Sequence, residues 1–241
     1  MTNITNDIKH MRLGGYQKLT LIDYPGKIAT TVFTVGCSFR CPFCHNPELV
    51  LADQFPELND MEAEFFKFLE KRKGKLEGVC ITGGEPTIQP DIINFIKKVK
   101  AMGFLVKLDS NGTRPDVLRK VIKEKLVDFI AMDIKNSPKK YSKTVGVSAD
   151  MERIKLSVYM IMNSGIDYEF RTTVVPGIHE EKDFDEIAKW IKGAKAYYLQ
   201  EFRDLKVIDP KLKGKRDVKP IDLEKIAGKI SGNFGVMKVR R

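Results

Sequence analysis

Six times along the 241-residue chain, a short apolar segment rich in β-branched residues is followed by a segment with helical spacing. The apolar segments cover residues 28–35, 78–81, 104–108, 127–132, 168–174 and 197–201. Most of them are nearly continuous apolar runs, which is typical of strands buried on both faces of a parallel sheet. The sequence therefore predicts an α/β fold, in which a parallel sheet with right-handed crossovers is either open or curled into part of a barrel.

The segments between these strands carry the start and stop signals of helices. Pro115 stands at the beginning of one helical segment, and Gly103 and Gly193 follow the last turns of two others. Proline is tolerated in the first turn because the amide there has no partner within the helix, and glycine accepts the positive φ that often follows a helix. These signals support the alternation of strand and helix.

The remaining segments define the expected domain organisation. No linker is evident, so we expect a loose arm over residues 1–12 and a single domain over 13–241. Within that domain the strand–helix core covers 28–203, and a C-terminal extension covers 204–241. The extension is expected to hold a helix and a last strand, at 221–230 and near 234–239.

Composition narrows the class of protein. With 42% hydrophobic and 31% charged residues, the chain has ample material for a core and is too apolar to be disordered. It has no apolar run near the ~18 residues that span a bilayer, and its N-terminus lacks the apolar stretch of a signal peptide. We therefore expect a cytoplasmic protein without a membrane span.

The formal charge of the chain is +10. This charge favours an acidic partner, a nucleic acid or an anionic cofactor, and the charge alone does not distinguish these three.

Polar residues and glycines follow the predicted strands at the points where the strands end. They fill residues 36–46, 82–86, 109–112, 133–136, 175–177 and 200–203. In parallel β/α folds, ligands and chemistry lie at the carboxyl ends of the strands. The sequence therefore predicts a functional site at this edge of the sheet.

Three cysteines in the first of these loops indicate a metal group. Cys37, Cys41 and Cys44 have the spacing C-x3-C-x2-C, and thiolates select zinc, copper(I) or iron–sulfur clusters. A structural zinc ion needs four protein ligands, which only His45 would complete here. A [4Fe–4S] cluster on three cysteines keeps one iron open to another ligand. Cys80 lies inside a predicted strand, where an unligated cysteine is commonly a buried core residue.

Five motifs follow in chain order on the predicted strand ends. They are CPFCHNP at 41–47, GGEP at 83–86, DSNG at 109–112, MDIK at 132–135 and VVPG at 174–177. Together with the cysteine loop, they resemble the radical S-adenosylmethionine (SAM) superfamily and, within it, the glycyl-radical-enzyme activating enzymes. Residues 21–27, LIDYPGK, are similar to the activating proteins of anaerobic ribonucleoside-triphosphate reductase. The resemblance implies a partial (β/α)6 TIM-like barrel of the radical SAM type.

The resemblance also implies the chemistry. A [4Fe–4S] cluster on Cys37, Cys41 and Cys44 would bind the amino and carboxylate groups of SAM at its open iron and cleave SAM reductively. The 5′-deoxyadenosyl radical would then take a hydrogen atom from a partner glycyl-radical enzyme, for which we expect anaerobic ribonucleotide reductase. A reduced flavodoxin or ferredoxin-like protein is the expected electron donor.

The first group of implied SAM contacts lies near the cysteine loop and the glycine motif. Phe43 is expected beside the adenine and His45 in the same pocket, although each is also compatible with an ordinary loop or surface residue. Gly83 and Gly84 have no Cβ, so polar atoms of a ligand can approach the backbone closely. Glu85 carries a charge that suits the α-ammonium group of SAM.

The second group lies on later strand ends. Asp109 and Asp133 are expected to contact the ribose or a small cation, and Asp109 has helix capping as an alternative. Ser110 belongs to the same motif and is counted among the cofactor-binding residues. Lys135 would face the carboxylate or ribose of SAM. Arg171 lies within a strand and needs a carboxylate partner, either SAM or a side chain.

The chain departs from the pyruvate formate-lyase activating relatives at the sixth strand. Those relatives place a histidine there, whereas residues 199–202 read LQEF, so that Gln200 is the candidate substitute. The chain also has no further cysteine-rich insert, so a single cluster is expected.

Two alternative functions remain at this point. One is a radical SAM enzyme that acts on a small molecule or nucleoside, as in tRNA modification, and the other is a non-catalytic zinc module that binds RNA. No RNA-binding motif is evident, so nucleic acid is not the expected partner.

Overall fold

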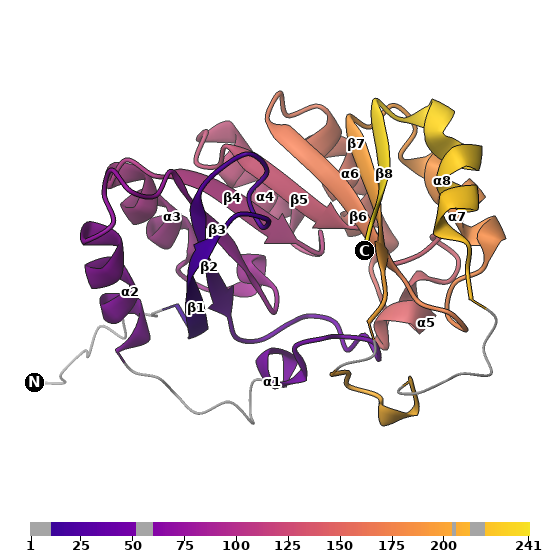
Figure 1. Ribbon diagram of the computed structural model, residues 1–241, viewed down its shortest axis with the longest axis horizontal. Helices are drawn as coiled ribbons and strands as arrows, with labels where there is room; N and C mark the ends of the chain where they lie inside the picture. The colour runs from indigo at the N-terminus through magenta and orange to yellow at the C-terminus, as the bar shows by residue number, and fades with distance from the viewer. Residues whose placement is uncertain (1–10, 52–59, 204–205, 213–219) are drawn as a thin grey trace, which may run out of the picture.

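The computed structural model describes residues 11–51, 60–203, 206–212 and 220–241. Within these ranges, eight strands form a single sheet in chain order (Figure 1). The strands are β1 (Leu13–Thr20), β2 (Ala29–Thr34), β3 (Gly78–Gly83), β4 (Leu105–Ser110), β5 (Phe129–Asp133), β6 (Asp167–Val174), β7 (Ala196–Glu201) and β8 (Val236–Arg240).

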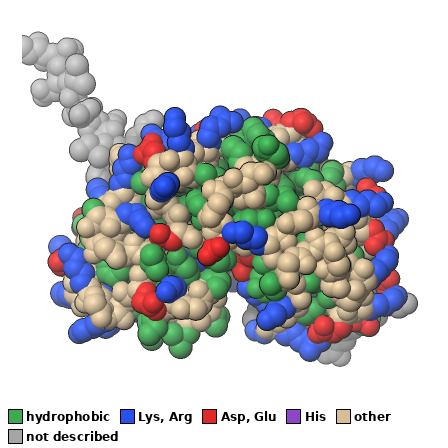
Figure 2. All heavy atoms as spheres, turned by 90° about the horizontal axis from the view of Figure 1, so that it is seen from above, with side chains coloured by type: hydrophobic (Ala, Val, Ile, Leu, Met, Phe, Trp, Pro, Cys, Tyr) green, Lys and Arg blue, Asp and Glu red, His purple; other side chains and the backbone are tan. Residues whose placement is uncertain are grey.

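The sheet is parallel from β2 to β8, and β1 pairs antiparallel with β2. It curls into part of a barrel that does not close, because β1 and β8 occupy its two edges. Figure 2 shows the resulting notch between the half of the molecule that carries β1 and the half that carries β8. The predicted α/β partial barrel is therefore confirmed, with the six predicted strands as β2 to β7 and the predicted last strand as β8.

In the part of the chain that the structure describes, six helices cover the outer face of the curled sheet (Figure 1). They are α2 (Met61–Glu70), α3 (Ile92–Ala101), α4 (Pro115–Lys123), α6 (Met151–Met162), α7 (Glu181–Trp190) and α8 (Leu223–Ile230). Two short helices, α1 (Pro47–Val50) and α5 (Tyr141–Val145), lie instead beyond the carboxyl ends of the strands. Single turns of 3-10 helix lie at Pro86–Ile88, Pro210–Leu212 and Ser231–Asn233. None of the helices in the described ranges is both long and apolar enough to cross a membrane.

The two faces of the sheet differ in polarity. On β4, Val106 and Leu108 are fully buried in the apolar core that the sheet forms with the helices. Because successive side chains of a strand point to opposite faces, Lys107 and Asp109 lie on the inner face of the curled sheet. The inside of this barrel is therefore a polar surface, on which charged groups can be held.

Strand β1 is a feature that the sequence analysis did not predict. Its sequence, LGGYQKLT, contains two glycines, which weaken a strand in isolation. The strand forms because it pairs with β2 at the edge of the sheet. Residues 1–10 of the predicted arm lie outside the described ranges, and its last two residues contact the domain. Met11 is 5% exposed, and the Val35 amide donates to the Arg12 carbonyl at 2.8 Å.

Candidate active site

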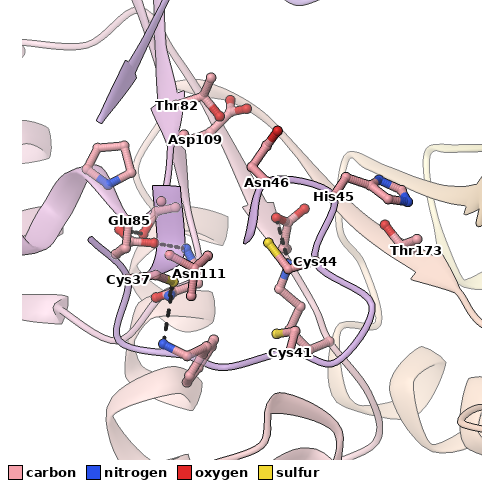
Figure 3. Close-up of a pocket in the computed structure, with 18 of the residues that line it drawn as sticks. Cys37, Cys41, Cys44, His45, Asn46, Thr82, Glu85, Asp109, Asn111 and Thr173 are labelled. Carbon is pink, nitrogen blue, oxygen red and sulfur yellow. Dashed lines mark hydrogen bonds and ion pairs between the residues drawn. The ribbon is translucent and has the colours of Figure 1, made fainter. Parts of the chain in front are cut away.

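A pocket of about 880 Å³, counted with its open mouth, lies at the carboxyl ends of the strands (Figure 3). Its position is the one that ligand sites take in parallel β/α folds. Of the thirteen predicted site residues, Arg171 alone does not line it. The predicted residues that do are Cys37, Cys41, Phe43, Cys44, His45, Gly83, Gly84, Glu85, Asp109, Ser110, Asp133 and Lys135.

The three predicted ligand cysteines are free thiols on one loop that lines this pocket (Figure 3). Burial raises the pKa of Cys37 to about 12 and that of Cys41 to about 11, so these thiols keep their protons unless a metal displaces them. A single ion needs its ligands around one point, and no three His, Cys, Asp or Glu residues in the described ranges are arranged in that way. A four-iron cluster offers a separate iron to each thiolate. The donor set therefore fits such a cluster.

Backbone contacts hold the cysteine loop, residues 36–46, in place. The Gly36 amide donates to the Leu49 carbonyl at 2.6 Å, and the Arg40 amide donates to the Val145 carbonyl at 2.8 Å. In addition, Nη1 of Arg40 donates to the carbonyl oxygens of Cys37, at 2.7 Å, and of Phe39, at 2.8 Å. The arginine side chain thus folds back over the loop that carries the cysteines.

Gly83 and Gly84 bring the second loop against the cysteine loop. A Cβ at Gly84 would lie 2.0 Å from the Gly36 carbonyl oxygen, and Gly83 has a φ of +112°. The Gly84 and Glu85 amides donate to the carbonyls of Thr34 and Gly36, both at 2.8 Å. The approach of a ligand was the expected reason for these two glycines. In the structure, backbone packing already requires them.

We expect Gly84→Ala to lower the free energy of unfolding, because the added methyl group meets backbone that cannot rotate away. Overpacking typically costs about 1–3 kcal/mol, and a direct backbone clash belongs at the upper end of that range. The measurement is urea denaturation followed by circular dichroism. Gly228→Ala is the matched control, since open space surrounds that position and alanine favours a helix by up to about 1 kcal/mol. An unchanged midpoint for Gly84→Ala would contradict the packing argument.

Glu85 connects the loop that carries Gly83 and Gly84 to the loop that follows β4 through hydrogen bonds. Its carboxylate accepts from the Thr87 amide at 3.0 Å, from the Ser110 hydroxyl at 3.0 Å and from the Asn111 amide at 2.6 Å. The side chain is buried, and burial raises its pKa although these hydrogen bonds oppose the shift. Glu85 therefore has a structural role in addition to its place in the pocket lining. Its predicted contact with an α-ammonium group stays a prediction.

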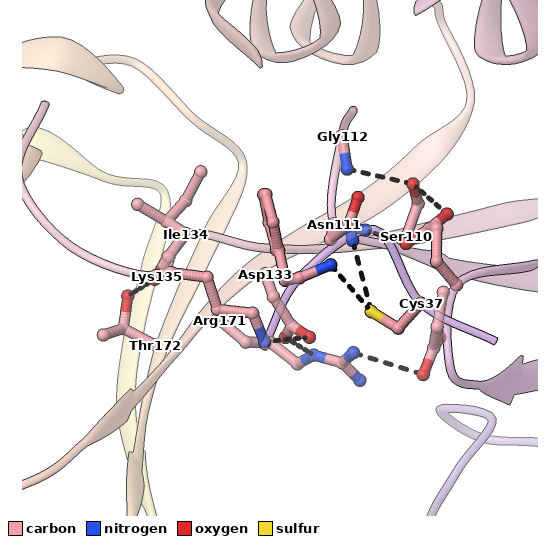
Figure 4. Close-up of polar contacts among 12 residues, drawn as sticks. Cys37, Ser110, Asn111, Gly112, Asp133, Ile134, Lys135, Arg171 and Thr172 are labelled. Atoms are coloured by element: carbon pink, nitrogen blue, oxygen red, sulfur yellow. Dashed lines mark hydrogen bonds and ion pairs between the residues drawn. The ribbon is translucent and has the colours of Figure 1, made fainter. Parts of the chain in front are cut away.

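A group of paired charges forms one wall of the pocket (Figure 4). Nε of Arg171 lies 3.0 Å from Asp133, and Nζ of Lys135 lies 3.0 Å from the other oxygen of Asp133. Burial alone would raise the pKa of Asp133, but Arg171 and Lys135 hold it well below its usual range. Asp109 is bound by Lys107 and, at 3.2 Å, by Nη2 of Arg171. Its carboxylate therefore forms ion pairs inside the barrel and does not cap a helix.

Arg171 is the centre of this network. Its side chain also lies 3.9 Å from Glu169, and Glu169 is bound by both terminal nitrogens of Arg240 at 2.8 and 2.7 Å. The guanidinium of Arg240 in turn stacks 3.5 Å above the ring of Tyr198. The carboxylates that the sequence argument required for Arg171 are thus protein side chains. A direct contact of Arg171 with SAM stays a prediction.

Comparison with known proteins identifies the family. Residues 31–191 match the family described as the Radical SAM superfamily. The chain belongs to this superfamily. It is 34% identical over 232 residues to a protein of Methanocaldococcus jannaschii named "Putative glycyl-radical enzyme activating enzyme", with 92% of each chain covered. It is 26% identical to the pyruvate formate-lyase-activating enzyme of Clostridium pasteurianum, over 89% of this chain and 93% of that one.

Solved structures support the fold. The radical SAM chain superimposes on QueE from Escherichia coli with a TM-score of 0.52 and 15% identity, over 95% of this chain and 93% of that one. At this identity the likeness concerns the fold alone. Membership of the superfamily makes the protein an enzyme and implies a [4Fe–4S] cluster and SAM as its cofactors.

Several pocket residues of this radical SAM enzyme were not predicted. Phe39, Asn46, Thr82, Asn111 and Thr173 are among those that line it. Thr173 lies two positions after Arg171 on β6, so the period-2 pattern of a strand already placed it on the inner face. Gln200, the candidate substitute for the missing histidine, is not part of the lining.

Two histidines support the rim of the pocket. His45 is exposed and stacks on Phe202, with ring centroids 5.6 Å apart. His179 is buried, accepts a hydrogen bond from the Val175 amide at 3.0 Å through Nδ1, and through Nε2 lies 2.8 Å from the Lys135 carbonyl oxygen. Its ring also lies edge-on to Phe43. His179 thus contacts the backbone of Lys135. No motif in the sequence predicted this contact.

Proposed function

We propose that this radical SAM enzyme is an activating enzyme, which generates a glycyl radical on a partner enzyme. The observation that carries the proposal is the extent of the match to the Methanocaldococcus jannaschii protein. It covers 92% of both chains and therefore continues well beyond the superfamily core at 31–191. Because members of the radical SAM superfamily are enzymes, the family match also argues against a non-catalytic zinc module.

The proposal assigns the cofactors to named residues. Cys37, Cys41 and Cys44 hold the cluster, which when bound supplies the electron for reductive cleavage of SAM. Lys135 presents a cation to the pocket that suits the carboxylate of SAM. Asp133 keeps this ammonium group charged, since the pKa of Lys135 is raised above its usual value in spite of burial.

The inner face of the barrel supports a peptide as substrate. Thr82 and Thr173 line the pocket, and their hydroxyl groups can donate and accept hydrogen bonds with the backbone of a peptide. The sheet does not close between β1 and β8, and this open side is the route that we propose for a loop of the partner protein. A glycine in that loop is the proposed substrate.

Anaerobic ribonucleotide reductase is the partner we propose, on the basis of the motif at 21–27. In the structure this motif follows β1 and precedes β2, so it lies at the end of the sheet opposite the cysteine loop. Asp23 accepts a hydrogen bond from the Thr31 hydroxyl at 2.6 Å, and Tyr24 is 4% exposed. The motif therefore supports the assignment through family resemblance and not through contact with the pocket.

Electron paramagnetic resonance tests the proposed function. We expect anaerobic incubation of the reduced, reconstituted protein with SAM and an anaerobic ribonucleotide reductase to give a glycyl doublet. The doublet should be absent without SAM and with a reductase whose C-terminal radical glycine is replaced by alanine. SAM cleavage that yields no protein radical, and that proceeds equally fast without the reductase, would instead favour a small-molecule substrate.

A further inference from the structure

The cysteine loop separates the pocket from the outer surface, and residues of the loop line both. Cys37 lines the pocket and also an outer groove of about 570 Å³. Phe39 lines the pocket and also a second outer groove of about 1380 Å³, which is formed with the N-terminal ends of α4 and α6. The loop that carries the three thiols can therefore be reached from outside without passing through the pocket.

The two outer grooves are lined by an excess of positive charge, all of it from arginine. The charged residues in the two linings are Arg12, Arg40, Arg114, Arg119, Arg153, Asp116 and Asp150. Asp116 is bound by Arg114 at 2.7 Å and by Arg153 at 2.9 Å. Asp150 accepts from two amides at the start of α6. Both carboxylates are thus occupied, and we call the five arginines the arginine face.

Arg40 places one of these charges directly on the cysteine loop. Its Nη1 donates to two loop carbonyls, those of Cys37 and Phe39, and the side chain is exposed. The arginine face therefore combines an excess of positive charge with a position behind the proposed cluster site.

We propose that the arginine face is the docking surface for an acidic, one-electron carrier protein. The inference rests on the proposed function, because a radical SAM enzyme must receive an electron before each cleavage of SAM. In the transfer the carrier is oxidised by one electron and the cluster is reduced by one, and no bond forms or breaks. SAM and the partner glycine occupy the inner side of the loop, so the outer side is the shortest path for the electron. Positive charge at that point attracts an acidic carrier and speeds the encounter.

The test uses charge reversal at Arg119, which is exposed on α4 and lines the groove without belonging to the pocket. The reconstituted protein is mixed anaerobically with an acidic flavodoxin in its hydroquinone state, and reduction of the cluster is followed by its visible absorbance. We expect Arg119→Glu to lower the second-order rate constant about tenfold at low ionic strength. The difference should vanish near 1 M salt, where the Debye length is only about 3 Å.

Two controls isolate docking from other effects. Photoreduced 5-deazaflavin, a small reductant that needs no docking surface, should reduce Arg119→Glu at the native rate. Lys189→Glu makes the same change in net charge on α7, at a side chain that is 77% exposed. It should leave reduction by flavodoxin within about twofold of native, because the interaction between charges weakens with their separation. The assay contains no glycyl-radical enzyme, so its result is independent of the proposed partner.

Three results would overturn the proposal. Reduction of Arg119→Glu by flavodoxin at the native rate would show that the carrier docks elsewhere. An equal loss of rate in Lys189→Glu would show that net charge alone matters. Loss of binding to a mixed-sequence RNA probe in Arg119→Glu, with native electron transfer, would assign the face to nucleic acid.

Discussion

Replacing Cys41 with alanine is expected to abolish the iron–sulfur cluster, whereas replacing Cys80 is expected to leave it intact. Cys41 lies on the loop that lines the pocket. Cys80 lies within β3, with its sulfur 3.9 Å from Asp109 and 3.7 Å from Nζ of Lys107, and is not part of the pocket lining. Anaerobic reconstitution should give about four irons per chain in the native protein and in Cys80→Ala, and close to background in Cys41→Ala.

The two variants control for each other, because each removes one thiol from a buried position. Circular dichroism should show that both chains remain folded, so that iron content reports ligation and not collapse. Loss of iron from Cys80→Ala to the same extent as from Cys41→Ala would contradict a cluster with three cysteine ligands. In that case the open coordination position proposed for SAM would not exist.

The site could be predicted from the sequence because of a general property of parallel sheets. Residues such as Cys37, Gly84 and Lys135 are far apart in the chain, but each follows a parallel strand. All such strands end at the same edge of the sheet, so their loops meet around one pocket. For this reason the predicted residues converge without any information about pairwise contacts.

The contacts between the site residues could not be predicted in the same way. Arg240 reaches Glu169 across 71 positions of sequence, and His179 reaches the Lys135 carbonyl across 44. Pairings of this kind depend on which strands become neighbours and on side-chain direction, which a single sequence does not encode locally. The same reason explains why β1 was missed: its two glycines disfavour a strand, and only the edge of β2 makes it one.

The role of Arg171 leads to the second large expected effect. Arg171→Met removes the cation that three carboxylates share, those of the buried Asp109 and Glu169 and the half-buried Asp133. Removing one partner of a buried ion pair typically costs about 3–5 kcal/mol, so we expect a loss of that size in the free energy of unfolding by urea. Each carboxylate keeps one other cation, which places the expected loss toward the lower end.

The same variant separates a positioning role of Arg171 from a direct contact with SAM. If Arg171 acts through Asp133, ligand-free Arg171→Met is destabilised, and SAM binding weakens because Lys135 loses its fixed position. Arg171→Lys restores the charge without the planar fork that reaches several carboxylates at once, and should recover only part of the stability. A direct SAM contact predicts the opposite pattern, with native unfolding in both variants and a loss confined to the dissociation constant of SAM. Because Nε and Nη2 of Arg171 already face Asp133 and Asp109 within 3.2 Å, the structure favours the first pattern.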